Sequence, residues 1–210
     1  MPELAATPAT ERPSTVATVA PGQPRYRHTV EEYLSFERGS PSKHEYYAGN
    51  IYAMTGASRR HVLIVTNLIR TLGNRLADRP CEIYGTDMRL KVGATGLYTY
   101  PDVAVTCGEP RFEDAEIDTL LNPQVVIEVL SKSTRDYDCT EKFDHYRGVE
   151  SVTDYVLVAQ DASHVEHRSR QPGGPWSVSV ASSLDGFVSL ESIGCELPMA
   201  DIYRRIQLPA

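Results

Sequence analysis

Apolar residues recur at helical spacing in two stretches of the chain. The first helix is predicted from Thr29 to Arg38, because Thr29 can cap it, acidic residues follow in its first turn, and Gly39 can end it. The second is predicted from Ser58 to about Ala77, where the apolar positions are Val65, Leu68, Leu72 and Leu76. Each helix therefore presents one apolar face to a core.

Elsewhere apolar residues form short or alternating runs that predict strands. The run EYYAGNIYAM predicts a hairpin, with strands near 45–47 and 51–54 on either side of Gly49 and Asn50. A helix from about Thr140 to Arg147 is predicted to end at Gly148. The remaining predicted strands are 81–85, 87–92, 100–107, 124–131, 155–159, 165–169, 176–180 and 187–192. This order predicts an α/β fold, one mixed sheet with helices packed against it.

Length and composition indicate one folded domain with an N-terminal tail. The chain has 210 residues, which allows a single core. Residues 1–25 are Ala, Thr or Pro at 14 positions, so we expect a disordered tail followed by a domain over 26–210. Apolar runs such as Val62 to Val65 are far too short to span a bilayer, and no apolar segment near the start suggests a signal peptide. We therefore expect a cytoplasmic protein that does not enter a membrane.

Charge and cysteine content narrow the possible partners. With 21 basic and 28 acidic residues the formal net charge is −7, so any contact with nucleic acid has to be local. The four cysteines are far apart in sequence and include no C-x-x-C pair. We expect them to be reduced and partly buried.

Two carboxylates stand in apolar strands. Asp102 begins the run DVAV, and Glu128 lies inside VVIEVL. Either could reach solvent at an edge or pair with arginine, but two carboxylates at matching height in neighbouring strands repel each other. A hard divalent cation would relieve that repulsion.

A lysine is the third candidate element, and two lysines follow Glu128. Lys132 lies just past the strand, where solvation is the simplest expectation. Lys142 lies on the next predicted helix, with Tyr146 on the same face. We favour Lys142, because a helix that packs back on the sheet can direct its side chain to the end of the Glu128 strand.

The ordered set of motifs resembles the Uma-two family of the PD-(D/E)XK nuclease superfamily. The motifs are YPDVAV, VIEVLSKST, EKFDHYRG and YVLV, together with EYYAGNIYAMTGAS, the RRH that opens the long helix, SIG at 192–194 and LP at 197–198. The resemblance extends from about Tyr33 to Tyr203. It implies a restriction-endonuclease-like fold in which Asp102 and Glu128 are metal ligands.

The resemblance also implies roles for further residues. The usual lysine position, two residues after Glu128, is Leu130 here, and in this family Lys142 on the following helix matches the lysine that replaces it. Glu45 matches an N-terminal acidic residue of the family, and His61 matches a histidine at the start of the long helix. For Glu45, pairing with Lys43 or an arginine remains an alternative, and for His61 a purely structural role does.

These observations predict a metal-dependent endonuclease that hydrolyses phosphodiester bonds in DNA. Mg²⁺ or Mn²⁺ would be held by Asp102 and Glu128, with the Val129 carbonyl as a further ligand. We expect basic residues to line the cleft, for example Arg59, Arg60, Arg89 and Arg135. A homodimer would allow two sites to cut two strands. The alternative is a non-enzymatic module that uses the nuclease fold for dimerisation or partner binding.

Overall fold

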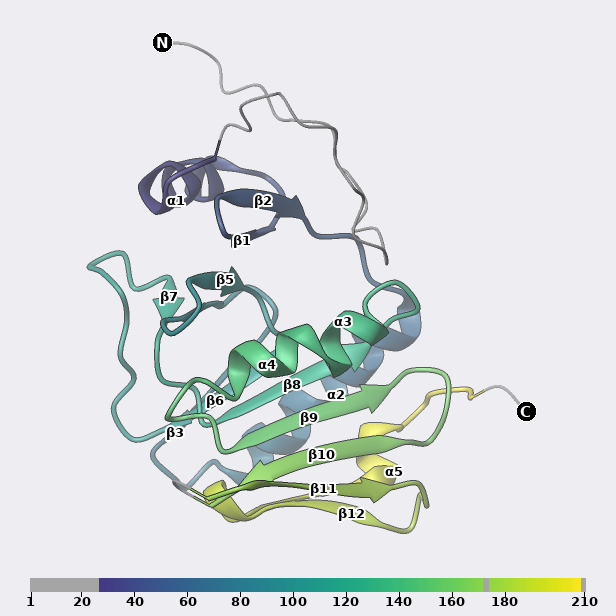
Figure 1. Cartoon of the computed structure of the whole chain (residues 1–210). Coiled ribbons are helices and arrows are strands. Elements are labelled where there is room, and N and C mark those ends of the chain that lie inside the picture. Colours follow the sequence, from purple (N-terminus) through teal and green to yellow (C-terminus); the bar gives the residue numbers. More distant parts are fainter. Residues whose placement is uncertain (1–26, 172–173, 209–210) are drawn as a thin grey trace.

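A six-stranded mixed sheet forms the centre of the computed structural model, which describes residues 27–171 and 174–208 (Figure 1). Its strand order is β11-β10-β9-β8-β6-β3. The central strands β8 and β9 are parallel, and the other neighbouring strands are antiparallel. The strands are β3 (Cys81–Tyr84), β6 (Val103–Cys107), β8 (Val125–Leu130), β9 (Asp154–Ala159), β10 (Val165–Arg170) and β11 (Trp176–Ala181).

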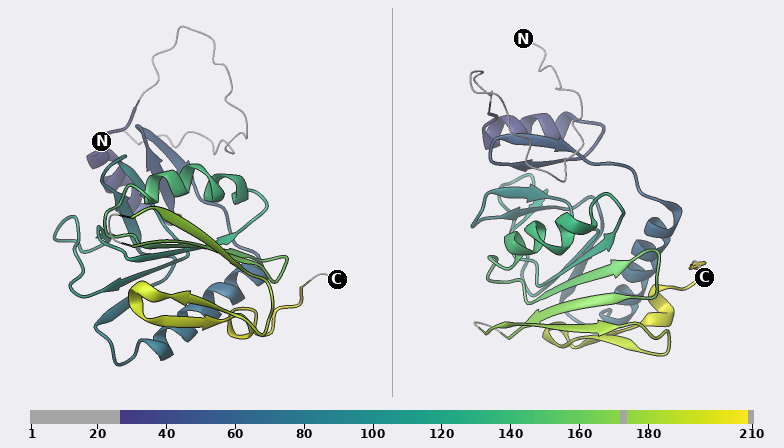
Figure 2. Two further views of the ribbon diagram at one scale, coloured as in Figure 1. Left: turned by 60° about the horizontal axis from the view of Figure 1, so that its bottom comes forward. Right: turned by 45° about the vertical axis from the view of Figure 1, so that its right-hand side comes forward.

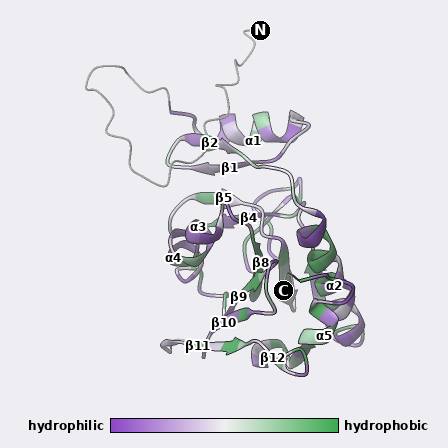
Figure 3. Ribbon diagram, turned by 90° about the vertical axis from the view of Figure 1, so that its right-hand side faces the viewer, coloured by the Kyte–Doolittle hydropathy of each residue, from purple (hydrophilic) through white to green (hydrophobic). Residues whose placement is uncertain are grey.

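Helices cover both faces of this sheet. The long helix α2 (Arg59–Arg75) packs on one face, and the short helices α3 (Arg135–Cys139) and α4 (Glu141–Tyr146) lie on the other (Figure 3). Alternation along β8 divides its side chains accordingly. Ile127 and Val129 belong to the core shared with α2, whereas Val126 and Leu130 belong to the core shared with α4. Glu128 lies between Ile127 and Val129 in the strand and therefore points to the opposite face, the one that α4 covers.

Two smaller sheets complete the fold. The five-stranded sheet has the order β2-β1-β5-β4-β7 and lies with helix α1 (Val30–Gly39) at one end of the molecule (Figure 2). Its strands are β1 (His44–Tyr47), β2 (Asn50–Ala53), β4 (Arg89–Val92), β5 (Leu97–Thr99) and β7 (Thr119–Leu120). The third sheet pairs β12 (Phe187–Leu190) with β13 (Cys195–Pro198), joined by the short 3₁₀ helix Glu191–Ile193 and followed by α5 (Met199–Ile202).

The predicted fold class, a mixed sheet flanked by helices, is confirmed, but the prediction of one sheet is wrong. Strand β1 pairs with β5 through Tyr46 and Tyr98, a contact between residues far apart in sequence, and this assembles a second sheet. Helix α3 was not predicted. The tail predicted over 1–25 lies outside the described residues.

The predicted starts of the first two helices are confirmed. The Thr29 side chain accepts a hydrogen bond from the Glu32 amide, and the Glu32 carboxylate accepts one from the Thr29 amide. The Ser58 hydroxyl accepts a hydrogen bond from the His61 amide and so caps α2. The Ser58 cap fixes where α2 begins, which matters for the site below.

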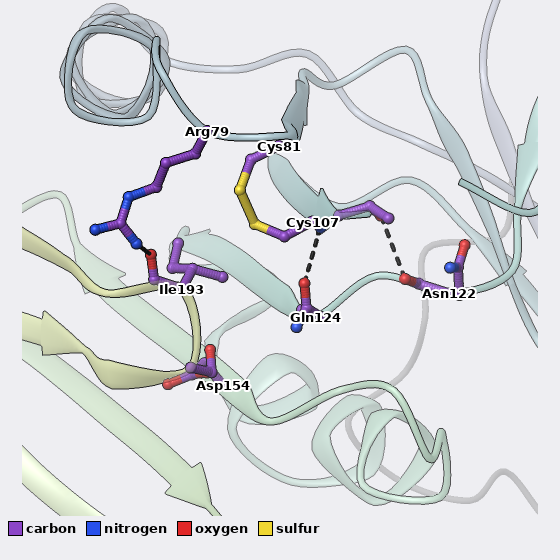
Figure 4. Close-up of a disulfide and its surroundings, with 9 residues drawn as sticks. Arg79, Cys81, Cys107, Asn122, Gln124, Asp154 and Ile193 are labelled. Atoms are coloured by element: carbon purple, nitrogen blue, oxygen red, sulfur yellow. Dashed lines mark hydrogen bonds between the residues drawn. A yellow bond between two sulfur atoms is a disulfide. The ribbon is translucent and has the colours of Figure 1, made fainter. Parts of the chain in front are cut away.

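The expectation of four reduced cysteines is wrong for one pair. Cys81 on β3 and Cys107 on β6 form a disulfide (Figure 4). They are directly opposite each other in the antiparallel register of the two strands, which brings the sulfurs together. Cys139 and Cys195 are free. In the part of the chain that the structure describes, we find no helix of the length and apolarity needed to cross a bilayer.

Candidate active site

Glu128 occupies the centre of a buried polar cluster between β8 and α4. Its side chain is 5% exposed, and its Oε1 atom lies 2.8 Å from Nζ of Lys142. The Tyr146 hydroxyl donates a hydrogen bond of 3.3 Å to the same oxygen. Lys142 and Tyr146 are four residues apart, so one face of α4 presents both to the strand.

Two further carboxylates face the same ammonium. Lys142 Nζ is 3.6 Å from Oε1 of Glu45 on β1 and 3.7 Å from Oδ1 of Asp138 on α3. Glu45 also accepts a hydrogen bond from the Thr99 hydroxyl on β5. Sequence reasoning missed Asp138, because it lies on the short helix α3, which was not predicted; its position four residues before Lys142 is the signal that could have found it.

Asp102 lies beside this cluster, directly before β6. Its Oδ2 atom accepts a hydrogen bond of 2.7 Å from the Val129 amide, and its Oδ1 atom is 2.8 Å from Nε2 of His61. The capped start of α2 is what brings His61 to this point. Asp102 and His61 are 15% and 14% exposed, so this side of the site opens toward solvent.

Burial and crowded charges shift the pKa values in the cluster. Burial raises the pKa of Glu128 well above its usual range, although the Lys142 charge acts in the opposite direction. Burial likewise raises the pKa of Asp138. For Lys142 burial favours the neutral form, but the charge of Glu128, followed by those of its other neighbours, outweighs it and raises the pKa. Lys142 is therefore a charged hydrogen-bond donor, and the carboxylates share too little positive charge.

That shortage of positive charge is the feature that fits a bound cation. Glu45, Glu128 and Asp138 share one ammonium at contact distance, and carboxylate oxygens are the ligands that Mg²⁺ and Mn²⁺ prefer. Among the described residues, however, no three His, Cys, Asp or Glu side chains are arranged to hold a metal ion. A cation would have to draw the carboxylates closer together.

The structure separates the two candidate lysines. Lys142 is 5% exposed and contacts Glu128, whereas Lys132 is exposed beyond the end of β8. Leu130, at the usual lysine position, points to the same side of β8 as Glu128 and is buried among apolar residues. Pairing of Glu45 with Lys43 is excluded, because Lys43 pairs with Asp87 at 3.0 Å.

Two of the four arginines expected at the cleft are otherwise engaged. Arg89 is 3% exposed and bonds to Thr119 and Tyr100, so placing it on a DNA-facing surface is wrong. Arg135 pairs with Asp161 at 3.1 Å on the surface. Arg59 and Arg60 stand at the start of α2, next to His61.

Comparison with known proteins identifies the family of this chain. The model of the Uma2 family, described as "Putative restriction endonuclease", matches residues 30–200. One uncharacterized protein of Synechocystis sp. is 35% identical over 185 residues, 88% of this chain and 96% of that protein. Another from the same organism is 36% identical over 148 residues, 70% of this chain and 84% of that protein.

A solved structure supports the fold. The crystal structure of "a putative nuclease belonging to DUF820" from Anabaena variabilis superposes with a TM-score of 0.67, covering 84% of this chain and 98% of that chain at 20% identity. The fold is thus restriction-endonuclease-like, and the family description supports a nuclease. The match over residues 30–200 and the identity to full-length relatives show that the chain belongs to the Uma2 family of restriction-endonuclease-like proteins.

Proposed function

We propose that the protein is a metal-dependent endonuclease that hydrolyses phosphodiester bonds in DNA. The observation that carries this proposal is the 2.8 Å pair between Lys142 and Glu128, buried next to Asp102 and surrounded by further carboxylates. A buried lysine among excess carboxylates is expensive to maintain for stability alone. Such clusters of perturbed groups concentrate at catalytic sites.

In this proposal Asp102 and Glu128, with the Val129 carbonyl, hold Mg²⁺ or Mn²⁺. The ion, when bound, polarises the scissile phosphate and makes the attacking water more acidic. Lys142 donates a hydrogen bond from its ammonium, either to that water or to the phosphate oxygen on which negative charge develops. His61 holds the Asp102 carboxylate in position, and Glu45 restrains Lys142 from the β1 side.

Cleavage of supercoiled plasmid and of single-stranded DNA, with Mg²⁺ or Mn²⁺, tests the proposal. Asp102→Asn and Lys142→Ala should each lower the rate by at least about 10²-fold, the size expected for a group that acts on proton transfer or transition-state charge. Lys132→Ala is the matched control: because Lys132 does not contact Glu128, this variant should keep the wild-type rate when DNA is saturating. If Lys132→Ala is the inactive variant and Lys142→Ala cuts, the role given to Lys142 is wrong.

A rescue variant tests the helix-borne lysine directly. Leu130 lies two residues after Glu128 on the same face of β8. In a Lys142→Ala background, Leu130→Lys returns an ammonium to the Glu128 side of the sheet. We expect partial recovery of cleavage in this double variant and none in a Lys142→Ala, Val126→Lys variant, because Val126 precedes Glu128 and lies away from Asp102 and the strand's end.

The second candidate is a non-enzymatic module with the same fold. It is favoured by the lack of a ready-made metal site among the described residues and by the net charge of −7. Mn²⁺ should raise the melting temperature of the wild type but not of Asp102→Asn if the enzyme hypothesis holds. No metal effect and no cleavage would favour the module.

The homodimer also remains a proposal. Light scattering of the purified protein across a tenfold concentration range measures it directly. A mass near the 23.3 kDa of one chain at every concentration would reject it.

A further inference from the structure

Most basic side chains in the described part of the chain already have partners. Arg38, Lys43, Arg70, Lys91, Arg135, Arg147 and Arg168 each pair with a carboxylate, and Arg79 and Arg170 bond to backbone carbonyls. Other basic residues have no such partner: Arg59, Arg60 and Lys132, and also Arg27, Arg75, Arg111, Arg204 and Arg205. Over the described residues, their side chains make neither a hydrogen bond nor an ion pair, and Arg59 and Lys132 are exposed.

Arg59, Arg60 and Lys132 stand around one point of the fold. Ser58, which caps α2 immediately before Arg59, hydrogen-bonds to the side-chain oxygen of Gln160. The amide nitrogen of Gln160 donates a 2.9 Å hydrogen bond to the carbonyl of Leu130, the last residue of β8. Lys132 follows two residues later. A continuous set of hydrogen bonds therefore joins the start of α2 to the chain that carries Lys132.

The same point borders the candidate active site. His61, two residues after Arg59, is the histidine that contacts Asp102 at 2.8 Å. The start of a 17-residue helix also contributes positive potential here. The nearby carboxylate of Asp161 is paired with Arg135, so it does not neutralise the three free cations.

We propose that Arg59, Arg60 and Lys132 form a phosphate-binding rim that contacts the backbone of a DNA duplex beside the Asp102 carboxylate. This inference rests on the proposed function, and it identifies how an acidic protein holds a polyanion at that site. Contacts of this kind fix position without reading sequence. In a chain with net charge −7, local unpaired cations are what such binding requires.

The experiment measures binding separately from cleavage. The full chain is titrated into a fluorescein-labelled DNA duplex in EDTA, where no metal supports hydrolysis, and anisotropy is followed from low to moderate salt. The test variants are Arg59→Gln with Arg60→Gln, and Lys132→Gln. The matched control is Arg75→Gln with Arg111→Gln, which also removes two exposed arginines that have no ion pair in the described structure. Arg75 is the last residue of α2, about 24 Å along the helix from Arg59.

The dependence of affinity on salt gives the expected size of the effect. Each lost phosphate contact lowers the slope of log affinity against log salt by about 0.9, so the α2 double variant should lose about 2 and Lys132→Gln about 1. Duplexes of different sequence should weaken equally, and the control should keep the wild-type slope.

Other outcomes overturn either the rim or the enzyme. An unchanged slope in the α2 double variant, an equal loss in the control, or no binding by the wild type each refutes the rim. Binding with the expected slopes but no cleavage with either metal leaves the rim intact and refutes the endonuclease. Wild-type cleavage at subsaturating DNA by a variant that lacks all three rim cations refutes the rim alone.

Discussion

Opening the Cys81–Cys107 disulfide should destabilise the protein by an amount set by the loop that the bond closes. The two cysteines are 26 residues apart. In the chain-entropy account, a cross-link over that length removes about 12 cal/mol/K from the unfolded chain, or about 3.5 kcal/mol at 25 °C. For a domain of this size about 1 kcal/mol shifts the melting temperature by roughly 2–4 °C, so reduction should lower it by roughly 7–14 °C.

Differential scanning calorimetry with and without a phosphine reductant measures this effect. A Cys81→Ser, Cys107→Ser variant should melt at the temperature of the reduced wild type and should not respond to the reductant. Cys139→Ser is the control, because Cys139 is free and half-buried, and this variant should keep the full response. Plasmid cleavage at temperatures below the melting transition should be unchanged, because Cys107 and Asp102 lie at opposite ends of β6.

Two results would contradict this reasoning. Four titratable thiols in the unfolded, unreduced protein would show that the bond does not form. A fall of less than about 2 °C on reduction would show that β3 is held by its strand pairing and by α2, and that loop closure matters little.

Three further predictions concern single residues and the tail. His61→Ala should weaken Mn²⁺ binding by about 10–100-fold in calorimetric titration, because Asp102 loses the group that orients it; unchanged affinity would make His61 purely structural. Asp138→Asn should raise the melting temperature in EDTA at pH 8 but not near pH 4. Burial raises the pKa of Asp138, so the wild type loses stability as pH rises through that folded-state pKa. A variant that is less stable at both pH values would contradict this reasoning. A chain starting near Tyr26 should melt within error of the full-length protein, since residues 1–25 have too few large apolar residues to add to a core; a large fall would show that they pack.

Local signals were sufficient for the elements that position most of the candidate site. Capping residues and apolar spacing located both long helices, and the continuous apolar run around Glu128 predicted a buried strand. Lys142 was favoured over Lys132 because a helix can return to a sheet whereas a strand end projects outward. Its contact with Glu128 follows from that geometry.

What the sequence did not reveal depends on contacts between distant segments. The second sheet exists because Tyr46 meets Tyr98, and no local pattern encodes that pairing. Arg89 reads as a surface cation until Tyr100 and Thr119 enclose it. Asp138 lies in RDYD, which looks solvent-exposed from its sequence, but packing of α3 against β8 and α4 buries it.

The position of a side chain on a helix depends on the contacts that hold the helix itself. The backbone hydrogen bonds of the sheet would hold a lysine in β8, but Lys142 depends on the contacts that hold α4 against the sheet. Those contacts are between aromatic rings. The ring centre of Phe143 lies 5.6 Å from that of Tyr155 and 5.1 Å from that of Trp176, and the ring centres of Tyr146 and Tyr155 are 5.4 Å apart. These ring contacts therefore position α4 and with it the Lys142 ammonium. If Lys142 acts as proposed, a smaller side chain at Trp176 would loosen the packing of α4 and lower the cleavage rate, although every carboxylate of the site is still present.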